Sequence, residues 1–96
     1  MNTIGEIKKI LGERKEEIRQ KYGVRIVGIF GSYARNEQKE TSDILIELER
    51  PIGLKFFELW DYLEELVGLK VDLLTVKALK QKPILYENVM EDLVYV

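Results

Sequence analysis

Apolar residues recur at helical spacing over the first quarter of the chain. From Thr3 to Tyr22 they fall mostly at three- and four-residue steps, with Lys, Glu and Arg between them. This pattern predicts an amphipathic helix that ends at Gly23. The next run, from Val24 to Phe30, is apolar and rich in β-branched residues, so we expect a buried strand there.

A polar and charged stretch begins at Asn36 and has the composition of a loop. The run DILIELE follows it, beginning at Ser42 or Asp43, and predicts a second strand. Successive strand residues point to opposite faces, so Asp43, Leu45 and Glu47 are expected to share one face.

Helical spacing returns between Leu54 and Val67, where a second helix is expected. Phe56, Phe57, Trp60, Leu63 and Val67 fall at helical spacing, and the aromatic residues are Phe56, Phe57, Trp60 and Tyr62. So many aromatic rings indicate either core packing or an exposed surface that binds a partner.

The last quarter of the chain predicts three short elements. Leu69 to Val76 is apolar and bounded by Gly68 and the polar stretch 77–82, which indicates a third strand with Asp72 inside it. Pro83 can begin a final helix that runs to about Glu91. The ending LVYV adds a short strand or packs as a tail.

This order of elements indicates an α/β (α+β) fold, with helices covering a small mixed β-sheet. The second and third strands are linked through a helix and are expected to be parallel, with a right-handed crossover. The first two are linked by a loop and are expected to be antiparallel. The length of 96 residues predicts a single domain, residues 1–96.

The composition limits the catalytic groups and metal ligands that the chain can supply. The chain has no Cys and no His, which excludes disulfides, zinc–thiolate sites, thiol nucleophiles and imidazole bases. The remaining carboxylates suit hard cations such as Mg²⁺. A net charge of −2 argues against direct binding of nucleic acid.

No apolar run approaches the roughly 20 residues of a membrane span, and the amphipathic, charged N-terminus is unlike a signal peptide, so a cytoplasmic protein is expected.

Gly31 and Ser32 follow the first predicted strand and are candidates for phosphate binding. A glycine lets the backbone approach a ligand, and a serine that enters a helix offers its hydroxyl beside free N–H groups. The alternative is a tight strand-to-helix turn with Ser32 as its N-cap.

Asp43 and Asp72 are acids within two apolar strands, where ionised carboxylates are costly unless they are paired, hydrogen-bonded or bound to a cation. On the same face of neighbouring strands they could converge on one metal ion. Alternatively, each lies at a strand end, exposed or ion-paired. The nearby basic residues are Arg25, Arg35 and Lys70.

Together, Gly31-Ser32, a ten-residue spacer, Asp43, and Asp72 within KVDLLT resemble the minimal nucleotidyltransferases of the DNA polymerase β superfamily. The stretches GSYARNEQ, RPIGLKFFELWDYLEELVGLKVDLLT, ILYENV and VYV extend the resemblance along nearly the whole chain.

This resemblance implies the nucleotidyltransferase fold, a Gly-Ser turn that holds nucleotide phosphates, and three acids that bind two Mg²⁺ ions. Many members of the family are antitoxins that bind and silence an HEPN-domain ribonuclease toxin, and some transfer AMP from ATP to a tyrosine of that toxin. The resemblance therefore implies a protein adenylyltransferase. Gly31 and Ser32 would bind the nucleotide, and Asp43 and Asp72 would be the catalytic and metal-binding residues. The oligomeric state stays open, a homo-oligomer included.

The sequence departs from the family at one point. The family has Asp-x-Asp after the spacer, and here the residues are Asp43, Ile44 and Leu45, as though one Asp-Ile pair were missing. Counted from the Gly-Ser turn, Asp43 matches the first family aspartate; counted back from Pro51, it matches the second. Glu47 would lie about 13 Å along an ideal strand and is not expected to substitute.

The missing acid leaves three interpretations open. The first is reduced AMP transfer, with one Mg²⁺ held by Asp43 and Asp72. The second is an inactive nucleotide- or toxin-binding module that neutralises its partner by masking, through the segment from Leu54 to Val67 or the C-terminal tail. The third is a metal-free structural relic.

Overall fold

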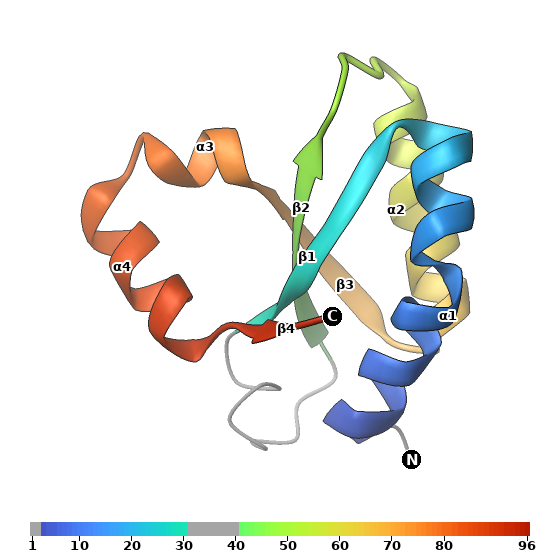
Figure 1. Cartoon of the computed structure of the whole chain (residues 1–96), viewed down its shortest axis with the longest axis horizontal. Coiled ribbons are helices and arrows are strands. Elements are labelled where there is room, and N and C mark those ends of the chain that lie inside the picture. The colour runs from blue at the N-terminus through green and yellow to red at the C-terminus, as the bar shows by residue number, and fades with distance from the viewer. Residues whose placement is uncertain (1–2, 31–40) are drawn as a thin grey trace.

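The computed structural model describes residues 3–30 and 41–96, and only the backbone of residue 41. Its elements are α1 (Ile4–Tyr22), β1 (Val24–Phe30), β2 (Thr41–Leu48), α2 (Lys55–Val67), β3 (Lys70–Thr75), α3 (Val76–Lys80), α4 (Pro83–Asp92) and β4 (Val94–Tyr95). Four strands form one mixed sheet, with α1 and α2 on one side and α3 and α4 on the other (Figure 1). The expected fold class is therefore confirmed.

Sequence signals at both ends of α1 explain its limits. The Thr3 hydroxyl oxygen accepts a hydrogen bond from the backbone N–H of Glu6 at 3.2 Å, which satisfies one N–H group of the first turn. At the other end, Gly23 adopts φ 70° and donates its N–H to the carbonyl of Arg19 at 2.8 Å. A left-handed residue of this kind favours glycine because it has no Cβ.

The strand order is β3-β2-β1-β4. β1 and β2 are antiparallel, and β2 and β3 are parallel with α2 between them in sequence, as expected. β4 lies antiparallel to β1, so the LVYV ending forms a strand. A bulge interrupts the register between Ile26 and Gly28, where Val27 is the extra residue of β1.

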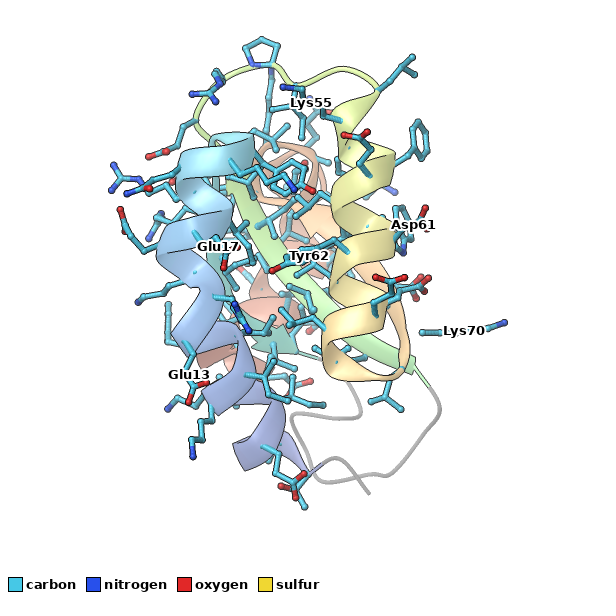
Figure 2. The ribbon with its side chains drawn as sticks, turned by 90° about the vertical axis from the view of Figure 1, so that its right-hand side faces the viewer. Glu13, Glu17, Lys55, Asp61, Tyr62 and Lys70 are labelled. Atoms are coloured by element: carbon cyan, nitrogen blue, oxygen red, sulfur yellow. The ribbon has the colours of Figure 1, made fainter. Side chains whose placement is uncertain are left out.

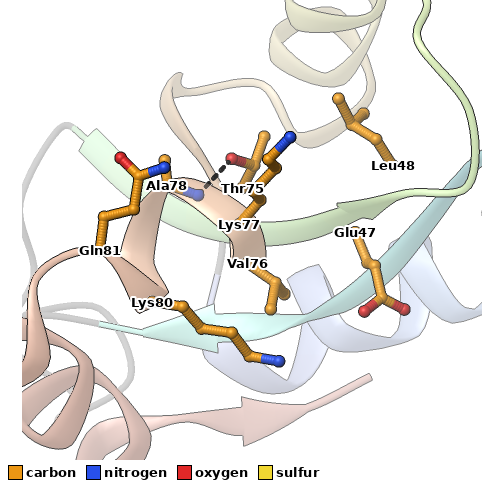
Figure 3. A pocket seen from close by; sticks show the side chains of 8 residues that line it. All are labelled: Glu47, Leu48, Thr75, Val76, Lys77, Ala78, Lys80 and Gln81. Atoms are coloured by element: carbon orange, nitrogen blue, oxygen red, sulfur yellow. Dashed lines mark hydrogen bonds between the residues drawn. The ribbon is translucent and has the colours of Figure 1, made fainter.

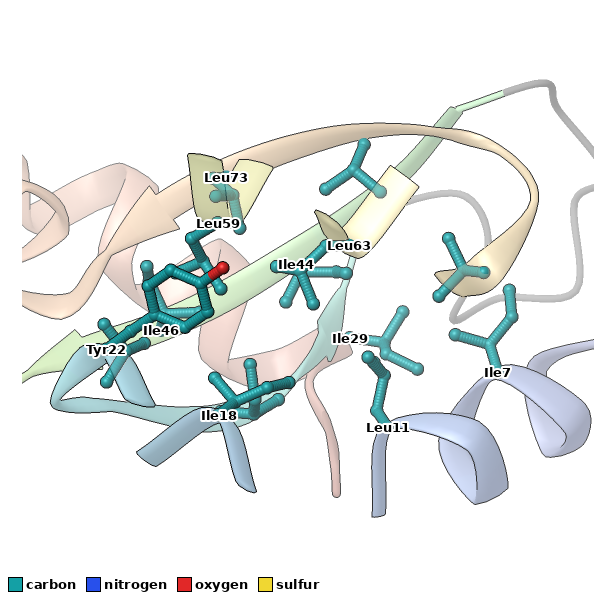
Figure 4. Packing of buried hydrophobic residues seen from close by; sticks show 14 residues of the cluster. Ile7, Leu11, Ile18, Tyr22, Ile29, Ile44, Ile46, Leu59, Leu63 and Leu73 are labelled. Carbon is teal, nitrogen blue, oxygen red and sulfur yellow. The ribbon is translucent and has the colours of Figure 1, made fainter. Parts of the chain in front are cut away.

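The sheet has a hydrophobic core on each face, because the side chains of β1, β2 and β3 alternate between the faces. The larger core contains fourteen buried residues and lies between the sheet and the α1–α2 pair (Figure 4). Tyr62 of α2 points into the space between the two helices, 6.3 Å from the ring of Tyr22 (Figure 2). The smaller core, under α3 and α4, contains four buried residues: Val27, Leu45, Leu79 and Val89.

One element was not expected from the sequence. The polar stretch 77–82 was expected to bound the third strand, but it lies largely in α3, which spans Val76–Lys80. The Thr75 hydroxyl oxygen accepts a hydrogen bond from the N–H of Ala78 at 3.2 Å and begins this helix. Leu79 is the helix residue that is fully buried against the sheet.

Candidate functional site

The two candidate acids lie side by side. Asp43 of β2 and Asp72 of β3 are direct partners in the parallel register, and neighbouring strands are about 4.8 Å apart. Both project from the sheet face that also carries Leu45 and Leu74, which pack in or against the smaller core. The arrangement on which a shared metal site was expected to depend, two acids on one face of neighbouring strands, is therefore present.

Exposure differs between the two carboxylates. Asp72 is exposed, whereas Asp43 is half-buried and takes part in at least one polar contact. Two ionised carboxylates in adjacent positions repel each other, so a cation shared between them lowers their mutual repulsion. This pair is therefore suited to binding a cation.

The end of β1 lies beside the acids. Phe30, its last residue, is the register partner of Asp43. Gly31 follows Phe30 directly in the sequence. The positions of Gly31, Ser32 and Arg35 fall outside the described residues, so the phosphate-binding roles considered for them stay predictions.

Glu47 and Arg25 belong to another contact. The Arg25 guanidinium donates hydrogen bonds to Oε1 of Glu47, at 3.2 Å from Nε and 2.9 Å from the terminal nitrogen. These residues are register partners across β1 and β2. The ion pair that we considered between Arg25 and an aspartate is thus replaced by one with Glu47. Lys70, the other described basic candidate, extends away from the sheet (Figure 2).

The donor set fits one Mg²⁺ ion better than two. Within residues 3–30 and 41–96, no three acidic side chains gather as a metal-binding group. Mg²⁺ commonly binds one or two protein carboxylates and completes its shell with water and substrate phosphates. Asp43 and Asp72 match that requirement, since both supply hard oxygen ligands.

Leu45 occupies the position two residues after Asp43, where the resemblance led us to look for a second acid. Its side chain is 1% exposed and lies in the smaller core with Val27, Leu79 and Val89. A carboxylate there would be buried in apolar surroundings, which is unfavourable without a partner. Strand β2 therefore presents one acid to the site.

A separate hollow of about 460 Å³ lies at the other end of β2 and β3 (Figure 3). Its lining comes from Glu47, Leu48, Thr75, Val76, Lys77, Ala78, Lys80 and Gln81. Glu47 is four residues from Asp43, which corresponds to about 13 Å along a strand. The hollow is therefore distinct from the pair of acids.

Comparison with known proteins decides the family. The model of the nucleotidyltransferase domain matches residues 7–96. The chain belongs to the nucleotidyltransferase family. It is 54% identical to "Putative protein adenylyltransferase MJ0128" of Methanocaldococcus jannaschii, with 100% of each chain covered. It is 48% identical to "Protein adenylyltransferase MntA" of Thermococcus cleftensis, covering 100% of this chain and 98% of the relative.

A solved structure supports the same assignment for this nucleotidyltransferase. The structure described as a "putative minimal nucleotidyltransferase" matches with a TM-score of 0.70 and 30% identity, covering 92% of this chain and 94% of that one. The family and the enzyme class implied by the sequence are thus confirmed. Separately, no helix in the described part of this nucleotidyltransferase has the length and apolar character needed to cross a membrane.

Proposed function

We propose that this nucleotidyltransferase transfers AMP from ATP to a hydroxyl group, that of a tyrosine, on a partner HEPN-domain ribonuclease toxin. The observation that carries the proposal is the in-register pairing of Asp43 with Asp72 on one sheet face. The names of the relatives, which are protein adenylyltransferases, support AMP transfer to a protein.

The reaction assigns a role to each candidate residue. Gly31 and Ser32 hold the nucleotide phosphates through backbone N–H groups and the serine hydroxyl. Asp43 and Asp72 hold the Mg²⁺ that accompanies ATP. When bound, Mg²⁺ neutralises charge on the α-phosphate and on the leaving pyrophosphate. Asp72, the more exposed acid, accepts the proton of the incoming hydroxyl as its oxygen bonds to the α-phosphorus and the bond to pyrophosphate breaks.

The rate is expected to be low for a protein adenylyltransferase. The strand offers one acid where the family has two. Counted from the Gly-Ser turn, the second acid would stand at Leu45, which is buried. Loss of a single preorganised electrostatic contact lowers enzymatic rates by about 10² to 10³. We therefore expect slow transfer with one Mg²⁺.

Labelled ATP tests the proposal. The chain is incubated with ATP labelled at the α-phosphate, Mg²⁺ and an HEPN-domain ribonuclease as the candidate acceptor, and label on that protein is measured. Label should appear with the wild-type chain and disappear with Asp72→Ala, because the proton acceptor and a metal ligand are lost. Glu13→Ala, at an exposed residue of α1, is the matched control and should leave the label unchanged. Equal labelling by Asp72→Ala would contradict the assignment.

An insertion tests the interpretation of the missing acid. Adding Asp-Ile between Ile44 and Leu45 supplies a second carboxylate two residues after the first. Since side chains alternate along a strand, an even number of added residues leaves each later side chain on its original face. We expect the insertion to raise the rate of AMP transfer. An unmodified chain as fast as the inserted one would show that one acid suffices.

A second candidate function is neutralisation by masking without transfer. It is favoured by two apolar side chains at the start of α2, since Leu54 is 82% exposed and Phe57 is 62% exposed. Exposed apolar groups of this kind are suited to a protein interface. A tight complex that carries no label, and that is weakened by Phe57→Ser, would support masking over transfer.

A further inference from the structure

Two side chains of α2 bind the outer edge of β3, next to the acidic pair. The indole Nε1–H of Trp60 donates a hydrogen bond to the backbone carbonyl of Val71. The backbone N–H of Val71 donates in turn to Oε2 of Glu64 at 2.9 Å. We call these two hydrogen bonds the Val71 clamp.

The Val71 clamp replaces a missing neighbouring strand. Among the described strands, β3 lies at the edge of the sheet, and its backbone pairs with β2 alone. The outward N–H and C=O groups of such a strand are unpaired unless another element covers them. Both groups of Val71 are satisfied by α2, which ties this edge of β3 to the helix.

Asp72 is the next residue along β3. Because the peptide groups of successive strand residues point to alternate edges, those of Asp72 face β2 when those of Val71 face α2. The side chain of Val71 is 2% exposed and lies in the larger core. Val71 is therefore fixed by its side chain and by both backbone groups, immediately before the acid.

We propose that Trp60 and Glu64 are positioning residues that hold Asp72 opposite Asp43, so that the two carboxylates bind one Mg²⁺ together. The inference rests on the proposed function, because it needs the metal bound by these acids. A slip of β3 by one residue would turn Asp72 toward the larger core. Smaller displacements of the edge strand would separate the carboxylates and weaken their joint binding of the ion.

The two clamp residues are themselves held in place. They lie one helical turn apart on the same side of α2, as residues i and i+4 do. The ring of Phe56 packs edge-on against the ring of Trp60, with 5.7 Å between the ring centroids. The backbone carbonyl of Glu64 accepts the N–H of Gly68 at 2.9 Å, which ends the helix just before β3. The ring contact restricts the side chain of Trp60, and the backbone hydrogen bond fixes the end of the helix that carries Glu64.

Three variants test the Val71 clamp. Trp60→Phe removes the N–H donor and keeps an aromatic ring, and Glu64→Leu removes the acceptor. Glu64→Gln keeps a side-chain carbonyl that can accept from Val71 and should restore binding. Glu13→Leu, at an exposed glutamate of α1, makes the same chemical change as Glu64→Leu away from the clamp.

Two readouts are measured on each variant. The first is Mg²⁺ affinity in the absence of ATP, followed by NMR through the backbone amide of Asp72. The second is the Mg²⁺ concentration that gives half the maximal rate of AMP transfer. Loss of residues that orient metal ligands commonly costs about 10- to 100-fold in affinity or activity. We expect a weakening of that size for Trp60→Phe and Glu64→Leu, and wild-type behaviour for Glu64→Gln and Glu13→Leu.

The outcomes separate this inference from the proposed function. If Asp72→Ala loses Mg²⁺ binding while folded Trp60→Phe and Glu64→Leu bind it as the wild type does, the positioning role is overturned and the function stands. If the wild-type chain neither binds Mg²⁺ at Asp72 nor transfers AMP, the proposed function is overturned, and the inference with it. Thermal unfolding verifies that each variant is folded; should Glu64→Leu unfold, Trp60→Phe decides the question.

Discussion

Gly28 of β1 allows the C-terminal strand β4 to pack closely against β1. It is the register partner of Tyr95 in β4 and of Leu45 in β2. A Cβ placed on Gly28 would meet the backbone carbonyl of Val94 and, at 2.9 Å, the Cδ1 atom of Leu93. The close approach of β4 to β1 therefore depends on the absence of a side chain.

The substitution Gly28→Ala should destabilise the chain by about 1 to 3 kcal/mol, because the added methyl group meets backbone that cannot move aside cheaply. Gly12→Ala is the matched control. A Cβ on Gly12, within α1, meets nothing within 4 Å, so alanine should stabilise the chain by roughly 0.5 to 1 kcal/mol through its helix propensity. Urea unfolding measures both. Equal changes in the two variants would argue against the steric explanation.

Individual residues differ in how far the sequence predicts them. The alternation of DILIELE was enough to predict that Asp43, Leu45 and Glu47 share one face, because alternation depends on local spacing. The pairing of Asp72 with Asp43 depends on the register of β2 with β3, which local spacing does not determine. The roles of Gly28, Trp60 and Glu64 depend on backbone atoms distant in sequence or in other elements. No periodic signal marks such contacts. The roles of Gly31 and Ser32 stay predictions, since both residues lie outside the described part of the chain.

How well the sequence predicts a helix depends on the length of that helix. α1 and α2 contain several turns each, so their apolar periodicity was visible, and the predicted limits agree with Ile4–Tyr22 and Lys55–Val67 to within about a residue. α3 has five residues, too few for periodicity. Its one available signal was Thr75, a residue type that commonly begins helices, followed by the helix formers Lys77 and Ala78.

The N-cap of α3 offers a test at the scale of one element. Thr75→Ala removes the acceptor for the N–H of Ala78 and should lower the free energy of unfolding by about 1 kcal/mol. Thr75→Ser keeps the hydroxyl and should stay close to the wild type. Chemical denaturation of both variants measures the difference. Identical losses for alanine and serine would attribute the effect to the γ-methyl group of threonine instead of its hydroxyl.

The whole molecule has two cores of unequal size on one sheet. Among residues 3–30 and 41–96, fourteen buried side chains join α1 and α2 to the sheet, whereas four lie under α3 and α4. The acidic pair faces the side of the smaller core. Regions with fewer buried apolar contacts open at lower free energy than the rest of a fold.

Native-state hydrogen exchange should therefore divide the molecule into two parts. Backbone amides of α3 and α4 are expected to exchange through an opening of lower free energy than those of α1, β1 and β2. Exchange is measured under conditions where closing is faster than chemical exchange, so that protection reports the free energy of opening. Uniform protection across all helices would show that both sides unfold as one unit.

The edges of the sheet bear on self-association. One edge ends in the two-residue strand β4, and on the other the backbone groups of Val71 already have partners in α2. Short or covered edges are poor templates for a strand from another molecule. Fibril-like growth, strand upon strand, is therefore disfavoured even at high protein concentration. A second copy of the chain would meet the first through helix surfaces, where Leu54, Ile84 and Phe57 are the most exposed large apolar side chains among the described residues.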